Sequence, residues 1–293
     1  MDTTSGTPVR ELRPKAGSSG SSAPRVGGSA PVGVTVKRLT HRFGDLHVLD
    51  ELSLDVAAGE VLGIVGPSGS GKTTLLELIA GLRELSGVGA DSAEGAAALT
   101  SIEIGSATSS TDRLAQCAYM PQRDLLLPWL RAIDNAAIAL RNRGLSRAEA
   151  RAAAAPNFKR FGLAGFELAR PDELSGGMRQ RVAFLRTLLA GKPVLLLDEP
   201  FGALDAITRG EMQEWLGSTL VSEPRTVLFV THDVEEALYV CDRIVILGPR
   251  PASVIAELAA PSPRSIPRID AITDAEFTSV REQALERLTA GAR

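Results

Sequence analysis

Cysteine, histidine and aromatic residues are scarce in this chain of 293 residues. It contains two cysteines, three histidines and 4% aromatic residues. Cys117 and Cys241 lie far apart and no CxxC pair occurs, so the sequence indicates neither a disulfide framework nor a zinc site. We therefore expect the protein to reside in a reducing compartment.

Long apolar runs are also absent. No uninterrupted run approaches the roughly 18 residues that a membrane-spanning helix needs, and the N-terminus lacks the apolar segment of a secretory signal. Acidic residues number 35 against 32 lysines and arginines, for a net charge of −3. This balance argues against a protein whose whole surface binds nucleic acid, and any membrane association is expected to depend on a partner.

Composition divides the chain into three parts. Residues 1–32 are rich in Gly, Ser and Pro without hydrophobic periodicity, and we expect them to form a disordered tail. Residues 33–250 are expected to form the folded domain. Residues 251–293 are expected to comprise a proline-rich segment without regular structure and a short C-terminal helix from about Asp274 to Leu288. Its predicted docking face consists of Phe277, Val280, Leu285 and Leu288.

Apolar runs in the central part alternate with helical patterns. Buried strands are predicted at 61–65, 194–197, 226–230 and 244–247, and helices at 73–82, 176–191, 206–221 and 234–241. Such alternation predicts an α/β fold with a largely parallel sheet.

Three further segments complete the expected fold. Two β-rich segments, 34–43 and 48–56, flank a turn at Gly44-Asp45. Residues 83–113 read as a surface excursion with a weak edge strand anchored by Leu99, Ile102 and Ile104. Residues 130–170 read as a helical insert that is interrupted at Pro156.

A glycine-rich motif follows the first buried strand. Residues 66–73 read GPSGSGKT, an instance of GxxxxGK[ST] placed between an apolar strand and an apolar helix. Its glycines let backbone N–H groups surround phosphates, and the helix presents its positive dipole end to them. Lys72 is expected to contact the β- and γ-phosphates, and Thr73 to ligate Mg²⁺.

An acidic pair ends the strand at 194–197. Asp198 falls at the carboxyl end of a buried strand, where α/β sheets bind ligands. Together with Lys72, this position predicts that Asp198 completes the Mg²⁺ shell and that Glu199 polarises a water for attack on the γ-phosphate.

A third motif, LSGGMRQ at 174–180, precedes a helix-like segment. Placed between GPSGSGKT and VLLLDEP, it resembles the ATP-binding subunits of ABC transporters over roughly residues 34–250. The resemblance implies a P-loop NTPase core, an antiparallel β-subdomain and an inserted α-helical subdomain at about 123–180. It also implies that the signature of one subunit closes over the ATP of a second copy in a head-to-tail homodimer.

The resemblance assigns roles to individual residues. Catalytic roles fall on Lys72, Gln122, Glu199 and His232, and Mg²⁺ contacts on Thr73, Gln122 and Asp198. Asp205 would couple the two sites of the dimer, and Ser175, Gly176, Gly177 and Gln180 would form the signature that acts in trans. Phe43 would stack on adenine, although a core-facing strand residue is the alternative. The ATP contacts are Phe43, Gly66, Pro67, Ser68, Gly69, Ser70, Gly71, Lys72, Thr73 and Thr74.

The segment after Gln122 resembles one branch of the ABC transporter family. The residues RDLLLPW at 123–129, with a following Asp-Asn, are similar to the ATPases of nitrate, sulfonate, taurine and thiamine-precursor importers. That likeness implies that Leu126, Pro128 and Trp129 dock on a membrane permease; packing of Trp129 inside the helical lobe is the alternative. Lys72 and Gln122 are 50 positions apart, which is longer than usual for this branch, and an Ala/Ser/Gly-rich stretch stands where the branch has a glycine-containing edge hairpin.

The expected function is that of an importer ATPase. It would bind ATP and Mg²⁺, lie on the cytoplasmic face of the membrane, and drive a separate permease served by an extracytoplasmic solute-binding protein. It would contact neither the transported solute nor nucleic acid. The alternatives are a soluble ABC ATPase that acts on nucleic acid or the ribosome, and an efflux ATPase.

Overall fold

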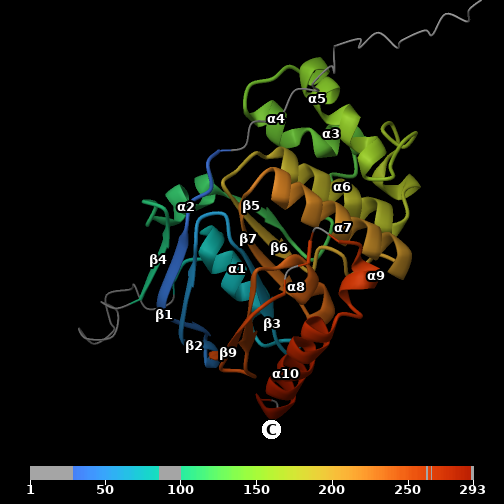
Figure 1. The fold of residues 1–293 in the computed structure, drawn as a ribbon. Coiled ribbons are helices and arrows are strands. Elements are labelled where there is room, and N and C mark those ends of the chain that lie inside the picture. The colour runs from blue at the N-terminus through green and yellow to red at the C-terminus, as the bar shows by residue number, and fades with distance from the viewer. Residues whose placement is uncertain (1–28, 86–99, 262, 265, 292–293) are drawn as a thin grey trace, which may run out of the picture.

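The computed structural model describes residues 29–85, 100–261, 263–264 and 266–291, and it is built on two sheets (Figure 1). The larger sheet has the order β5-β6-β7-β3-β8-β9. All its neighbouring strands are parallel except β8 and β9, which are antiparallel. This arrangement confirms the predicted parallel α/β core. Its strands are β3 (Val61–Val65), β5 (Cys117–Met120), β6 (Val194–Asp198), β7 (Thr226–Thr231), β8 (Arg243–Leu247) and β9 (Val254–Ala259).

The smaller sheet is antiparallel, with the order β2-β1-β4. It consists of β1 (Val34–Phe43), β2 (Leu46–Val56) and β4 (Ser101–Ile104). Gly44 turns the chain between β1 and β2 with a φ of 55°, as the sequence predicts. β4 is the predicted edge strand, whereas Leu99, which was expected to anchor it, falls outside the described residues.

Alternating side chains of the buried strands serve two hydrophobic cores. In β3, Leu62 and Ile64 face a core shared with the antiparallel sheet and α1 (Lys72–Ala80). Val61 and Val65 face the other core, which lies against α6 (Gly176–Leu189), α7 (Ala206–Ser222) and α8 (Val234–Val240). Because both faces are covered, the strands are continuously apolar. The carboxyl ends of β3 and β6 consequently lead directly into the phosphate loop and the acidic pair.

A group of helices lies beyond one end of the parallel sheet (Figure 1). It contains α3 (Ala132–Ala136), α4 (Ile138–Asn142) and α5 (Arg147–Arg160). The expected interruption at Pro156 was wrong, because α5 continues through it. Ala150, Ala154 and Phe158 are buried at helical spacing on either side of the proline and hold the helix against the core.

Regular structure after Gly248 also corrects the prediction. β9 lies between Pro251 and Pro261 and pairs with β8 as the edge strand of the sheet, so neither proline has to donate a ladder hydrogen bond. The terminal helix α10 (Ala275–Gly291) exists, but Leu285 is 47% exposed. Ala284 is buried in its place, because position 284 continues the helical spacing from Phe277 and Val280.

Two described segments carry structure that the sequence did not predict. The sequence places residues 29–32 in a disordered tail, yet Ser29 N–H donates to the Gly191 carbonyl at 3.3 Å and the Val32 carbonyl accepts from Thr226 at 2.7 Å. Within the expected surface excursion, Ser109 caps α2 (Ser110–Gln116) through the Asp112 N–H. The rest of the predicted tail, 1–28, lies outside the described residues.

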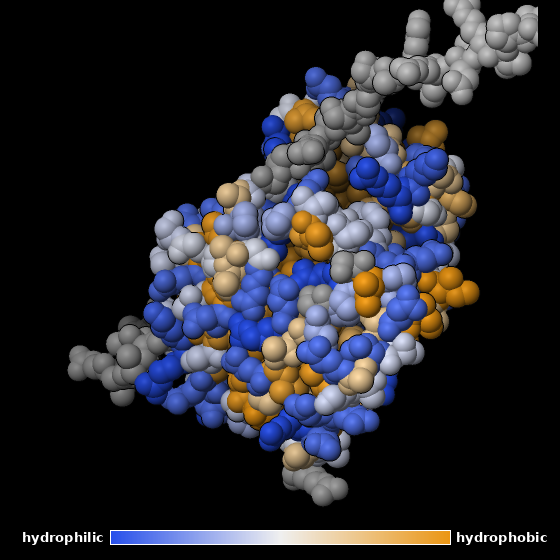
Figure 2. All heavy atoms as spheres, viewed as in Figure 1, coloured by the Kyte–Doolittle hydropathy of each residue, from blue (hydrophilic) through white to orange (hydrophobic). Residues whose placement is uncertain are grey.

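Hydrophobic residues on the face shown in Figure 2 form small groups separated by hydrophilic ones. Within the part of the chain that the structure describes, no helix combines the length and apolar character needed to cross a membrane. A short helix, α9 (Arg268–Ala271), precedes α10 and completes the fold.

Candidate functional site

Residues 66–71 form a tight loop between β3 and α1. Gly69 and Gly71 have φ angles of +76° and +110°, which side-chain-bearing residues rarely adopt. A Cβ at Gly71 would also lie 2.8 Å from Val48 Cγ1 on β2. The glycines therefore allow the chain to turn sharply into the first turn of α1, where unpaired N–H groups and the helix dipole favour an anion.

The Lys72 ammonium group lies inside this loop. Only 7% of the residue is exposed, and Nζ donates to the carbonyl oxygens of Gly66 and Pro67 at 2.8 Å each. Burial lowers the pKa of Lys72, and the negative charges of Glu199 and Asp198 partly oppose this effect. The lysine is thus held at the centre of the loop as a single buried positive charge.

Thr73 and Asp198 meet where α1 and β6 approach each other. The Thr73 hydroxyl donates to Asp198 Oδ2 at 2.7 Å, and Asp198 is 1% exposed. Burial raises the pKa of Asp198, while the Thr73 hydrogen bond opposes the shift. Oxygen donors of this kind are the ligands that Mg²⁺ prefers. The described residues hold no cluster of three or more His, Cys, Asp or Glu, so a hydroxyl and an amide would have to complete such a site.

Two residues from different segments of the chain converge on the Glu199 carboxylate. Glu199 accepts a hydrogen bond from Gln122 Nε2 at 3.1 Å, and its other oxygen lies 3.2 Å from His232 Nδ1. Glu199 itself has a φ of +47°, and its N–H donates to the Val230 carbonyl at 2.9 Å. Strained backbone of this kind concentrates at functional sites. The predicted catalytic residues Gln122, Glu199 and His232 therefore lie together at the carboxyl edge of the sheet.

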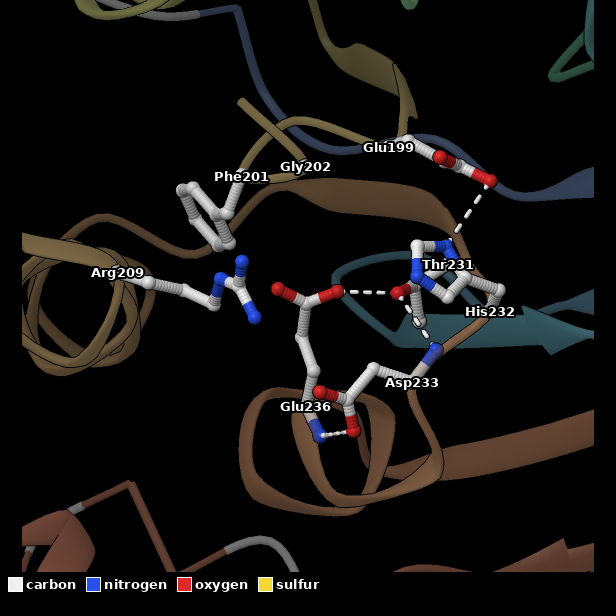
Figure 3. Close-up of a pocket in the computed structure, with 8 residues that line it drawn as sticks. All are labelled: Glu199, Phe201, Gly202, Arg209, Thr231, His232, Asp233 and Glu236. Atoms are coloured by element: carbon white, nitrogen blue, oxygen red, sulfur yellow. Dashed lines mark hydrogen bonds and ion pairs between the residues drawn. The ribbon is translucent and has the colours of Figure 1, made fainter. Parts of the chain in front are cut away.

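A small cavity of about 40 Å³ is lined by residues that include Arg209, His232 and Glu236 (Figure 3). The buried Glu236 carboxylate accepts from the Thr231 hydroxyl and, at 3.0 Å, from Gln213 Nε2 of α7. Thr231 in turn accepts from the Asp233 N–H at 3.1 Å, which fixes the turn that carries His232. Burial raises the pKa of Glu236 to about 7. Arg209 points toward Glu236 from α7.

A larger cleft of about 340 Å³ opens over the phosphate loop. Phe43 stands on its wall with 40% of its surface exposed, which excludes the core-facing alternative. The ring packs edge-to-face on His41 at 4.7 Å, and the Arg83 guanidinium lies 5.1 Å from its centre. The lining is Phe43, Leu46, Val48, Ser68, Gly69, Gly71, Lys72, Thr73, Thr74, Gln122, Asp198, Glu199 and Arg250.

The signature segment lies outside this cleft. Ser175 caps α6 by accepting from the Met178 N–H at 3.2 Å, and Ser175 and Gly176 are exposed. A Cβ at Gly177 would lie 3.2 Å from Leu204 Cδ2, so the glycine lets α6 approach the segment before α7. The segment thus presents a capped helix start that its own chain leaves exposed.

The position of Gln180 does not fit its predicted contact with the ATP of a second copy. It is 3% exposed and donates to the Pro200 carbonyl of its own chain at 3.3 Å, because its position on α6 faces inward. Asp205 is exposed and caps α7 by accepting from the Thr208 N–H at 3.0 Å. Hydrogen bonds from Thr208 lower the pKa of Asp205.

The segment after Gln122 exposes two of its three predicted docking residues. Trp129 is 70% exposed, so it does not pack inside the helical lobe, and Pro128 is exposed as well. Leu126 is 9% exposed and belongs to the hydrophobic core, which removes it from the docking face. The buried Asn135 side chain holds the turn by accepting from the Leu127 N–H at 2.8 Å and donating to the Leu127 carbonyl at 3.2 Å.

Two arginines of α6 hold this segment, and no sequence motif assigned them a role. Arg179 pairs with Asp124 at 3.0 Å, and Arg186 donates to the carbonyls of Asp124 and Leu125 at 2.8 and 2.9 Å. Arg179 follows the signature glycines and Arg186 lies two turns further along the helix. Their regular spacing on α6 was visible in the sequence, but the loop that they contact was not predictable from local patterns.

Comparison with known proteins finds matches to one protein family. Residues 49–202 match the family model described as ABC transporter. The formylaminopyrimidine import ATP-binding protein ThiZ of Halalkalibacterium halodurans is 43% identical, over 73% of this chain and 78% of that protein. The aliphatic sulfonates import ATP-binding protein SsuB 1 of Rhodococcus jostii is 40% identical, over 88% of this chain and 94% of that protein.

Another relative and a solved structure extend the comparison. The taurine import ATP-binding protein TauB of Chromobacterium violaceum is 40% identical, over 81% of this chain and 87% of that protein. The ATP-binding cassette MJ0796, solved as a dimer in a post-hydrolysis state with ADP and phosphate, superimposes with a TM-score of 0.66. It is 28% identical and aligns over 78% of this chain and 98% of that one.

Proposed function

The chain belongs to the ABC transporter family as an ATP-hydrolysing, ATP-binding subunit of the importer type, and we propose that it powers uptake of a small solute through a separate permease. The proposed solute is of the nitrate, sulfonate, taurine or thiamine-pyrimidine-precursor type. Relatives named for a formylaminopyrimidine, aliphatic sulfonates and taurine support this range. A permease and its solute-binding protein would select within it, and the ATPase would not touch the solute.

The convergence of Gln122, Glu199 and His232 beside the phosphate loop carries the proposed chemistry. Glu199 would accept a proton from the attacking water as the water oxygen bonds to the γ-phosphorus and the bond to the β,γ-bridging oxygen breaks. Gln122 would orient that water together with Glu199. Lys72 and His232 would stabilise the charge on the transferring group, and the products would be ADP and phosphate.

The magnesium ion that such ATPases use fits the residues present here. We propose Thr73, Asp198 and Gln122 as its holders, because the hydroxyl and carboxylate are already within hydrogen-bonding distance and all three offer oxygen ligands. Bound there, it would neutralise phosphate charge. Thr73 and Asp198 would keep each other oriented through their hydrogen bond.

A head-to-tail homodimer would complete each site. The exposed Ser175 and Gly176 do not line the cleft of their own chain, so they are free to approach the ATP of a second copy. Asp205 would couple the two sites through α7. The dimeric cassette structure supports this proposal.

We further propose that Pro128 and Trp129 dock on the permease at the cytoplasmic face of the membrane. Trp129 is 70% exposed, and Asn135 hydrogen-bonds the backbone on both sides of it, at Leu127 and Leu130, so this tryptophan is a well-placed interface anchor. The importer-named relatives favour this reading over an efflux ATPase, and the net charge of −3 does not favour a nucleic-acid or ribosomal partner.

Affinity capture tests the docking proposal. The tagged protein would be purified from gently solubilised native membranes, as wild type, as Trp129→Ala and as the control Ile269→Ala, whose side chain is similarly exposed at 67%. We expect a polytopic permease with the wild type and the control, and at least tenfold less with Trp129→Ala, at unchanged ATP affinity. Equal recovery with all three proteins, or capture of ribosomes or nucleic acid instead, would overturn it.

A further inference from the structure

The loop between β8 and β9 lies against the phosphate-binding region. Residues 248–253 read GPRPAS, and their backbone is fixed to β2 by two hydrogen bonds. The Ala252 N–H donates to the Val48 carbonyl at 2.9 Å, and the Asp50 N–H donates to the Ala252 carbonyl at 3.0 Å. Gly248 and Ser253 close the loop with a further bond at 3.0 Å. The loop therefore has a fixed position beside the cleft.

Arg250 extends from this loop into the same cleft as Lys72. A Cβ built on Gly69 would lie 3.2 Å from a terminal nitrogen of the Arg250 guanidinium, so the group rests against the turn of the phosphate loop. Arg250 is exposed, and within the described part of the chain no carboxylate pairs with it. Its charge is thus available to a ligand in the cleft.

Arg250 is a second positively charged side chain at the cleft, beside Lys72. The lining of the cleft contains two carboxylates, Asp198 and Glu199, and two cations, Lys72 and Arg250. The Lys72 ammonium is buried and already donates to two carbonyls of the loop. An arginine keeps its charge at every physiological pH and can donate two parallel hydrogen bonds to phosphate oxygens.

We infer that Arg250 is a further nucleotide-binding residue, which contacts the polyphosphate of ATP or ADP from the β8–β9 loop. The inference rests on the proposed placement of the nucleotide in this cleft. Arg250 would thus join the proposed nucleotide site from a loop that contains neither the phosphate-loop residues, nor Asp198 and Glu199, nor the signature segment. Because the contact would form with substrate and product alike, it should act on affinity more than on the chemical step.

Calorimetric titration of the full-length protein tests this contact. The probes are ATP in EDTA without added metal, ADP, AMP and adenosine. The variants are Arg250→Ala, Arg250→Lys and the control Arg143→Ala, which removes an exposed arginine from the helical region. We expect Arg250→Ala to weaken ATP and ADP about tenfold, with an intermediate loss for Arg250→Lys and no change for the control. Adenosine affinity should not change.

Steady-state hydrolysis gives a second readout. We expect Arg250→Ala to raise KM for ATP by a similar factor and to leave kcat within about twofold. ATP and ADP affinities within twofold of wild type, or an equal loss for adenosine and ADP, would overturn the inference. Lys72→Ala is measured in parallel. If it too retains full ADP binding, the proposed nucleotide cleft fails; if it alone loses binding, only the role of Arg250 fails.

Discussion

At the scale of single residues, Glu199 holds the candidate site together. Its two carboxylate oxygens contact Gln122 and His232, residues that reach it from separate segments of the chain. Its positive φ angle fixes the carboxylate at the strand end at the cost of local strain. A change that keeps the shape of this side chain but removes its basicity should therefore separate ATP binding from hydrolysis.

Glu199→Gln provides that change. We expect a fall in kcat of about 10²- to 10⁴-fold, because an amide cannot accept the proton of the attacking water, with ATP affinity retained. Without turnover, the ATP-bound dimer should accumulate. Phosphate release and size-exclusion chromatography with and without ATP measure the two effects, and Glu211→Gln, on the exposed side of α7, serves as the control. Hydrolysis at the wild-type rate would refute the assigned role.

The sequence located most of these residues because their motifs are short and local. The phosphate loop, Asp198 and Glu199 follow directly from strand-end positions, and the structure places them where that pattern predicts. The exposed roles predicted for Gln180 and Leu126 do not fit the structure, because both side chains are buried. A motif gives the order of residues, whereas tertiary packing decides which of them face inward. Arg250 was missed because its loop reaches the cleft only through pairing with β2.

At the scale of elements, α5 shows how packing overrides a local signal. Pro156 lacks the N–H that would bond to the Ala152 carbonyl, which is why the sequence predicts an interruption of the helix there. Burial of Ala150, Ala154 and Phe158 holds both halves in one helix. β9 shows the same principle, since an edge position lets a strand form between two prolines.

The retained proline makes α5 less stable than it can be. Pro156 is exposed, so we expect Pro156→Ala to restore one helical hydrogen bond without disturbing the core. The gain should be about 1–3 kcal/mol, after allowance for the greater freedom that alanine gives the unfolded chain. Urea unfolding measures it. Pro171→Ala is the control, because Pro171 begins a short 3₁₀ helix where proline is favoured; equal stabilities of Pro156→Ala and wild type would contradict the prediction.

At the scale of the whole molecule, the two hydrophobic cores lie on opposite faces of the parallel sheet. Glu236 is buried at the carboxyl edge of this sheet, beside the candidate site residues Glu199 and His232. Its carboxylate lies between β7 and α7 and is 4% exposed, facing Arg209 and, on its own segment, Asp233. Burial raises its pKa from 4.5 to about 7, with the Thr231 and Gln213 hydrogen bonds and the charge of Arg209 opposing the shift. Folding therefore favours the protonated form of this group.

This preference couples global stability to pH. Below pH 4.5 the Glu236 carboxyl is protonated in both the folded and the unfolded state, and its contribution to the free energy of unfolding is fully present. As pH rises toward about 7, the carboxyl ionises in the unfolded chain but stays protonated in the folded one, so this contribution is lost. Above pH 7 both states are ionised and the loss levels off. The total is on the order of 3 kcal/mol. Glu236→Gln cannot titrate, so the difference in unfolding free energy between wild type and variant should change across this window in urea titrations at pH 5, 6, 7 and 8. A pH-independent difference would show that Glu236 is not protonated by burial in the folded protein.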